Sequence, residues 1–273
     1  MATKELEPQV ETIIAAKRQY LKERMAKTPI EAVRALASMQ KRPHPVLSNV
    51  SQDSPVMMIG QIRYKLPQTD RLGENYDPVG LALRYAQAGL DAVALFTDAT
   101  IYEGGLDDLV LVSRAVNIPV ISEDYILDEY QIVEVRAAGV SALLLSATIL
   151  EPGQLRALVS ATHRNRMTAI VQVHDEDELK HALSLSPYVI GLSSYNPHTD
   201  TYDPTLIARL RAMIPSHIRV MVTDGLKTLD DVATILALDV HAMLICEQVL
   251  AEPTAAARLR AMVSANRHGD SPE

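Results

Sequence analysis

Eight short apolar runs, separated by stretches with helical spacing, are the feature that most constrains the fold of this chain. The runs are residues 55–62, 91–98, 118–124, 141–147, 168–174, 188–194, 219–224 and 241–247. Their near-continuous apolar character is expected of strands that are buried on both faces of a parallel sheet. Because helical stretches lie between them, the pattern favours consecutive βαβ units.

An internal repeat supports the same arrangement. The segments AQAGLDAVALFTD, RAAGVSALLLSA and LALDVHAMLICE each read as a helix end, a turn and an apolar strand. Gly89 and Gly139 occupy the turn, where glycine favours a left-handed helix cap, and Asp239 takes that place in the third copy. Residues 55–265 divide into eight units of about 26 residues, which predicts a (β/α)8 TIM barrel. A doubly wound open sheet is the alternative, although the chain lacks its GxGxxG turn.

The first 50 residues follow a different pattern and predict an N-terminal helical extension. Apolar residues recur at helical spacing over 9–26, and a second helix is expected over 30–39, after Thr28 and Pro29. We therefore divide the chain into the extension (1–50), the barrel (51–265) and a disordered tail (266–273). The sequence does not show whether the extension covers the barrel or forms an interface, nor does it give the oligomeric state.

Composition excludes several classes of partner. The net charge of −8 disfavours nucleic acid, because a phosphate backbone requires a basic surface. No apolar run approaches the length of a membrane span. Cys246 is the single cysteine, so an intrachain disulfide is impossible and a reducing, cytoplasmic location is expected. The remaining partner class is a small molecule.

Polar residues at the carboxyl ends of the runs form the candidate site, because barrel chemistry occurs at that face. The candidate ligand-binding residues are Gln61, Lys65, Asp98, Tyr125, Ser193, Tyr195, Thr223, Asp224, Gly225, Cys246 and Glu247. We expect no cofactor and no metal: the acidic residues and His174 lack a metal-ligand spacing. His174 is expected to have a structural role, and Cys246 to be a small buried side chain.

Several of these segments resemble the indole-3-glycerol phosphate synthase family. The most specific is PVISEDYILDEYQIVEVRAAGVSALLL, residues 119–145, and shorter matches cover 95–109, 171–179, 189–196 and 222–226. The order and spacing hold from about residue 8 to residue 262. The resemblance implies a (β/α)8 barrel. It also implies an activity: ring closure of 1-(2-carboxyphenylamino)-1-deoxyribulose 5-phosphate, with loss of CO2 and water, in tryptophan synthesis.

The departures from that family fall on its chemistry. The resemblance places the general acid, a lysine in the family, at Glu123 and the general base, a glutamate, at Gln172. Arg63 stands for a lysine and keeps the positive charge, but arginine does not act as an acid. Neutral or altered groups also replace two glutamates, an asparagine and an arginine, at Gln61, Thr223, Ser193 and Tyr195.

The phosphate-binding positions that the resemblance implies are altered as well. Gly225 is kept, but Asp224 puts a negative charge where the family has serine, and Cys246 replaces a glycine. Lys65 and Arg71, in the loop after the first run, are the two candidates for a compensating cation.

Three hypotheses follow for the function. The first, which the substitutions favour, is a synthase-like barrel that has lost or altered ring closure and binds a different small ligand or acts without catalysis. The second is an active synthase with a rearranged set, in which Glu123 is the acid and Lys65 reaches in from its loop. The third is a new activity on a neutral or cationic substrate. The sequence leaves open whether the chain is an enzyme.

Overall fold

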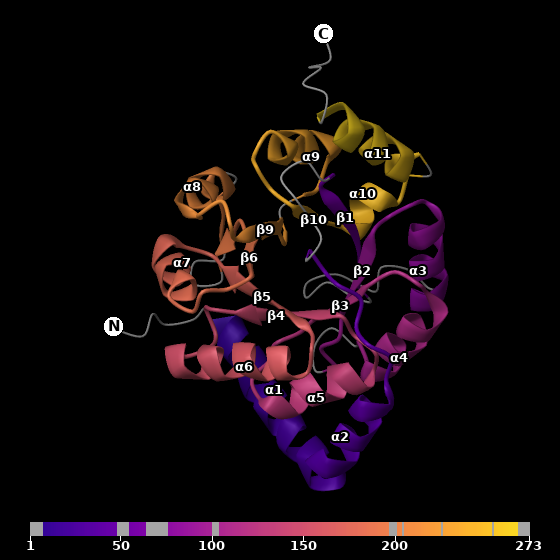
Figure 1. Ribbon diagram of the computed structural model, residues 1–273, viewed down its shortest axis with the longest axis vertical. Coiled ribbons are helices and arrows are strands. Elements are labelled where there is room, and N and C mark those ends of the chain that lie inside the picture. Colours follow the sequence, from indigo (N-terminus) through magenta and orange to yellow (C-terminus); the bar gives the residue numbers. More distant parts are fainter. Residues whose placement is uncertain are drawn as a thin grey trace.

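A closed barrel of parallel strands forms the centre of the computed structural model, which describes residues 8–47, 55–63, 76–99, 104–196, 201–203, 205–224, 226–252 and 254–266 (Figure 1). The barrel order is β1-β10-β9-β6-β5-β4-β3-β2, closing on itself. The barrel strands are β1 (Met57–Ile62), β2 (Ala92–Phe96), β3 (Val120–Glu123), β4 (Ala142–Ser146), β5 (Thr168–Val173), β6 (Val189–Leu192), β9 (Arg219–Val222) and β10 (Ala242–Ile245). Each strand falls within one of the eight apolar runs, so the predicted (β/α)8 barrel is confirmed.

Helices surround this barrel. They are α3 (Pro78–Gln87), α4 (Leu106–Ala115), α5 (Glu129–Ala137), α6 (Pro152–Arg164), α7 (Glu176–Leu183), α8 (Leu206–Met213), α9 (Leu229–Leu236), α10 (Glu247–Leu250) and α11 (Ala255–Asn266). Asp128 and Thr228 begin α5 and α9 with capping boxes, which satisfy backbone amides that lack a helical partner. Gly89 and Gly139 have φ of 84° and 94°, which confirms their predicted role as left-handed caps.

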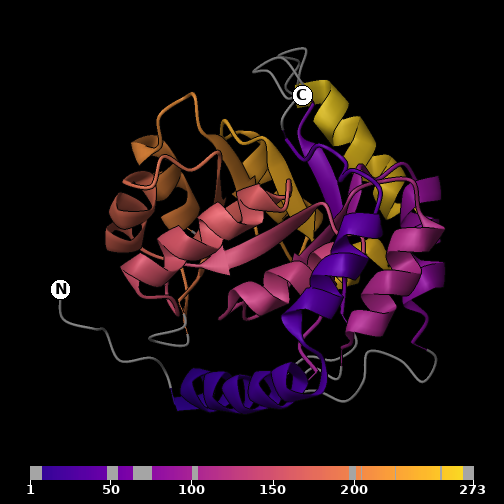
Figure 2. The ribbon, with the colours of Figure 1, turned by 60° about the horizontal axis from the view of Figure 1, so that its bottom comes forward.

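The N-terminal extension contains α1 (Pro8–Lys27) and α2 (Ile30–Met39), close to the predicted ranges. Figure 2 shows α1 as a long helix along one side of the barrel. Helix α2 packs on α5, where Arg136 donates to the carbonyls of Gln40 and Lys41. The extension therefore packs against the barrel of its own chain.

The segment after α2 closes the amino-terminal end of the barrel. Val46 and Leu47 are buried in a cluster with inward-facing residues of the strands, among them Ile59 and Met221. The hydroxyl of Tyr188, which precedes β6, donates to the carbonyl of Leu47 at 2.9 Å. The site must therefore open at the opposite, carboxyl end.

The structure differs from the predicted elements at two places. A short antiparallel hairpin, β7 (Tyr195–Asn196) with β8 (Thr201–Tyr202), follows β6 and was not predicted. Residue 266 belongs to α11, and the rest of the predicted tail lies outside the described residues. Among the helices in the described part of the chain, none is both long and apolar enough to cross a membrane.

Candidate functional site

Glu123, at the end of β3, is the centre of the candidate site. Its side chain is buried, and both of its carboxylate oxygens accept hydrogen bonds from Nε2 of Gln61 on β1, at 3.0 and 2.9 Å. Nη2 of Arg63 lies 3.6 Å from Oε2 of Glu123, and the Arg63 guanidinium lies over the ring of Phe96. The structure thus brings together three of the predicted site residues, with the Glu123 side chain buried among them.

Burial raises the pKa of Glu123 above its ordinary value. The charge of Arg63 and the hydrogen bond from Gln61 oppose this shift, whereas the negative charge of Asp224 adds to it. Because the net direction is upward, Glu123 carries its proton to higher pH than a solvated glutamate does. It can therefore donate a proton under conditions in which an ordinary carboxyl group cannot.

Gln172 and Thr223 form a neutral pair across the same end of the barrel. Nε2 of Gln172 donates to Oγ1 of Thr223 at 2.9 Å, and Oγ1 of Thr223 donates to the carbonyl of Leu192 at 3.1 Å. Neither side chain exchanges a proton at ordinary pH. The two residues therefore supply shape and hydrogen bonds at this position.

Asp224 turns toward the end of β6. Its carboxylate accepts hydrogen bonds from the hydroxyls of Ser193 and Ser194, and from the backbone amide of Ser194 at 2.7 Å. These donors use the acceptor positions of Asp224, so its charge is held in place. Tyr195, next along the chain, packs on Tyr202 of the hairpin, with ring centroids 5.1 Å apart.

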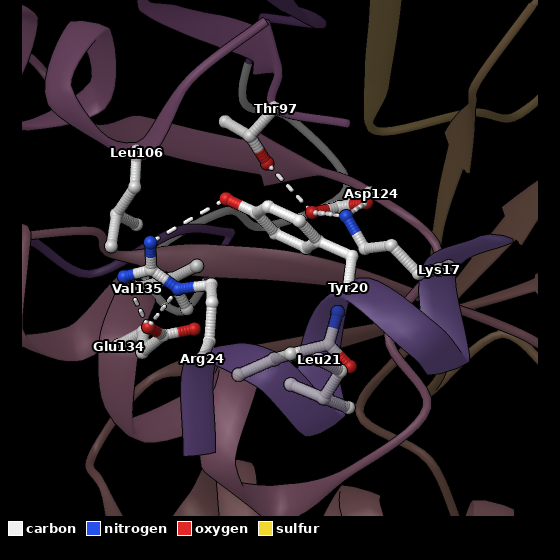
Figure 3. A pocket seen from close by; sticks show the side chains of 10 residues that line it. Lys17, Tyr20, Leu21, Arg24, Thr97, Leu106, Asp124, Glu134 and Val135 are labelled. Carbon is white, nitrogen blue, oxygen red and sulfur yellow. Dashed lines mark hydrogen bonds and ion pairs between the residues drawn. The ribbon is translucent and has the colours of Figure 1, made fainter. Parts of the chain in front are cut away.

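Asp98 and Asp124 have a partner that the sequence did not predict. Lys17, from α1, lies 2.6 Å from Oδ1 of Asp124 (Figure 3). It also lies 3.2 Å from Oδ2 of Asp98. Asp98 is fully buried. A buried carboxylate requires a counter-ion, and the helical extension provides one. The ligand-binding role expected for Asp98 stays a prediction.

Sequence reasoning missed Lys17 because the partner lies 107 residues away. One signal was present: Lys17 occupies the apolar face of α1, in register with Val10, Ile14 and Leu21, all of which are buried. A lysine on such a face is seldom buried unless it is paired.

The remaining predicted residues lie around the mouth or outside the described residues. The thiol of Cys246 donates to the carbonyl of Leu226 and its side chain packs against the core, half-buried. Tyr125 packs edge-on against Phe96. Oε2 of Glu247 and Nε of Arg63 are buried without a hydrogen-bond partner among the described residues. Lys65 and Gly225 lie outside those residues.

His174, directly after β5, is held by contacts with Thr148 and Glu178. Its Nδ1 is 2.7 Å from Oγ1 of Thr148 and 3.3 Å from Oε2 of Glu178, and its backbone amide donates to the same oxygen of Glu178. Burial alone raises the pKa of Glu178, but these contacts with His174 outweigh it and lower that pKa. Within the described ranges, no group of three or more acidic, histidine or cysteine side chains could hold a metal ion.

Comparison with known proteins finds one family. A family model described as indole-3-glycerol phosphate synthase matches residues 10–262. The indole-3-glycerol phosphate synthase of Roseiflexus sp. (strain RS-1) is 31% identical over 256 residues, which cover 91% of this chain and 95% of that protein. The protein of the same name from Dehalococcoides mccartyi (strain CBDB1) is 32% identical over 76% of this chain and 82% of its own length. These matches confirm the resemblance carried by the sequence motifs.

Proposed function

Because the chain belongs to the indole-3-glycerol phosphate synthase family, we propose that it closes an indole ring at the mouth of the barrel, with Glu123 as the proton donor. The substrate would be 1-(2-carboxyphenylamino)-1-deoxyribulose 5-phosphate, and the pathway tryptophan biosynthesis. Similarity to named synthases over most of the chain supports this activity better than the loss of ring closure that the substitutions favour. The observation that carries the proposal is the buried Glu123 carboxyl with its raised pKa.

The first step requires an acid at the ketone oxygen. The ring carbon that bears the carboxylate bonds to the ketone carbon, and Glu123 protonates the ketone oxygen as that bond forms. The carboxylate then leaves as CO2, and its bonding electrons restore the aromatic ring. A carboxyl group held protonated by burial suits this donation, because general acids act best when their pKa lies near the working pH.

The second step is loss of water. The new hydroxyl takes up a proton and leaves, and the carbon next to the nitrogen loses a proton to form the double bond of the indole. One proton is consumed overall. Because Gln61 and Gln172 do not titrate, Glu123 is the group in this cluster that can do both: after it takes up a proton from solvent, it protonates the leaving hydroxyl and then accepts the carbon proton.

Arg63 is suited to hold a negative group of the substrate. Its side chain is a quarter exposed, and its Nε is a buried donor without a partner in the described part of the chain. A guanidinium binds a carboxylate or a phosphate through two parallel hydrogen bonds. We therefore assign Arg63 to the substrate carboxylate, which must lie near the carbon that reacts.

A specific observation favours a second candidate function, in which the barrel binds a different small ligand without ring closure. Asp224 holds a fixed negative charge beside the position where the family binds phosphate, and Gln172 with Thr223 forms a neutral pair. A phosphorylated ligand would be repelled by Asp224. A neutral or cationic ligand would not.

A turnover assay separates the two functions. The purified chain is given the phosphorylated substrate, and formation of the indole product is followed by fluorescence. Ring closure predicts turnover by the parent and a loss of about 100-fold or more in Glu123→Gln. Glu129→Gln, a partly exposed carboxyl group on α5, is the matched control and should keep full activity.

Each outcome of this assay supports or excludes one of the two candidate functions, or the role of Glu123. Turnover that Glu123→Gln leaves unchanged rules out Glu123 as the acid. No turnover by the parent rules out ring closure. Binding of a non-phosphorylated ligand, measured by calorimetry, then supports the second candidate.

A further inference from the structure

Lys17 is a buried lysine on a helix outside the barrel. Its side chain is only 4% exposed. Burial of an ammonium group is costly unless opposite charges and hydrogen bonds compensate. The groups around Lys17 must therefore compensate its charge, and they show which parts of the chain the side chain connects.

Its ammonium group joins the carboxyl ends of two neighbouring strands. Asp98 follows β2 and Asp124 follows β3, and both lie within 3.2 Å of the lysine nitrogen. Burial alone lowers the pKa of Lys17, but Asp124 and Asp98 outweigh it and raise that pKa, so the group stays charged. The cluster is a buried ion triad that links α1 to β2 and β3.

The same contacts fix the backbone of Glu123. Asp124 also accepts hydrogen bonds from its neighbour, the Tyr125 amide, at 2.7 Å and from Oγ1 of Thr97 at 3.1 Å. The backbone amide of Thr97 donates to the carbonyl of Glu123 at 2.9 Å. Thr97 thus binds both the carbonyl of Glu123 and the side chain of Asp124, the residue that follows it. Lys17 binds the same Asp124 side chain.

We propose that Lys17 is a positioning residue for the site: by holding Asp124 and Asp98, it keeps the Glu123 carboxyl group in place at the barrel mouth. Helix α1 is then part of the site rather than a cover. This inference rests on the proposed function only in taking Glu123 as the reacting group. An error of about 1 Å in the position of such a group can lower the rate about 100-fold.

A second ion pair on the same helix provides the matched control. Arg24, two turns after Lys17, lies 2.6 Å from Oε1 of Glu134 on α5 (Figure 3). This pair also anchors α1, and Glu134 lines the same pocket as Lys17 and Asp124, but it belongs to helix α5 and not to the end of a barrel strand. If Lys17 only docks α1, then Lys17→Met and Arg24→Met should have similar effects on the site.

The experiment compares Lys17→Met and Arg24→Met with the parent. The first readout is kcat per folded protein: we expect about a 100-fold loss for Lys17→Met, with a smaller change in KM, and less than about a twofold change for Arg24→Met. The second is the titration midpoint of Glu123, followed by carbon NMR of labelled glutamate and assigned with Glu123→Gln. Gln61, Arg63 and Asp224 face this group and stay unchanged, so a shift reports a changed position or field at Glu123.

For Lys17→Met we expect the Glu123 midpoint to rise by about one pH unit, because the positive charge of Lys17 is lost while the carboxylates of Asp98 and Asp124 remain. A lower melting temperature in both variants, with unchanged kcat and midpoint, would overturn the proposal. If the parent shows no turnover, the proposed function fails, and the titration alone decides the role of Lys17. If Lys17→Met does not fold, Asp124→Asn replaces it, because Lys17 keeps Asp98 as a counter-ion; an unchanged midpoint in that variant also overturns the proposal.

Discussion

The amide of Gln61 binds both carboxylate oxygens of Glu123 through one nitrogen, at 3.0 and 2.9 Å. An amide suits a carboxyl group that changes its protonation state. Nε2 donates to the ionised form, and after a flip Oε1 accepts from the protonated form. A glutamate at residue 61 would instead put a second negative charge against Glu123. Gln61 therefore lets a single carboxyl group exchange its proton in a buried site.

Removal of this donor should raise the pKa of Glu123 further, because the hydrogen bond from Gln61 lowers it in the parent. We predict that Gln61→Met shifts the Glu123 titration to higher pH in carbon NMR of labelled glutamate. Gln172→Met is the control, since Gln172 donates its hydrogen bond to Thr223. A midpoint at or below that of the parent would contradict the assignment of Gln61.

Replacement of Asp224 should act in the opposite direction. Its negative charge helps to raise the pKa of Glu123, so Asp224→Asn should move the Glu123 midpoint to lower pH. The same variant should bind inorganic phosphate more tightly, because one negative charge is removed from the mouth. Calorimetry with phosphate and the NMR titration test the two effects separately. An unchanged midpoint would show that Asp224 lies too far from Glu123 to influence it.

Burial of Glu123 should also make stability depend on pH. Its folded-state pKa is raised, so the folded chain binds more protons than the unfolded chain above the ordinary carboxyl pKa. This group therefore stabilises less as pH rises through the folded-state pKa. We predict that Glu123→Gln becomes more stable relative to the parent as pH rises, in urea unfolding from pH 5 to pH 8. Glu129→Gln, which is partly exposed, should show no such trend.

The sequence predicts the barrel, because the barrel depends on local patterns, and the family resemblance places Glu123 in the candidate site. Apolar runs and helix caps repeat at short range, and the end of each run marks the end of a strand. The partners of Asp98 and Asp224 do not follow in this way. Each depends on which neighbour the folded chain brings close: Lys17 in one case, Ser193 and Ser194 in the other. A sequence pattern can indicate that a carboxylate is buried, but it does not identify the distant group that compensates the negative charge.

The segment that closes the amino-terminal end of the barrel could not be predicted from the sequence either. Leu47 is 1% exposed and packs among inward-facing strand residues, although nothing near it in sequence marks it as part of the core. Leu47→Ala should lower the free energy of unfolding by about 2–5 kcal/mol, the usual cost of such a cavity. Leu36→Ala, at a site on α2 that is 55% exposed, should change it by less than about 0.5 kcal/mol. Urea unfolding measures both, and equal costs would show that Leu47 does not seal the barrel.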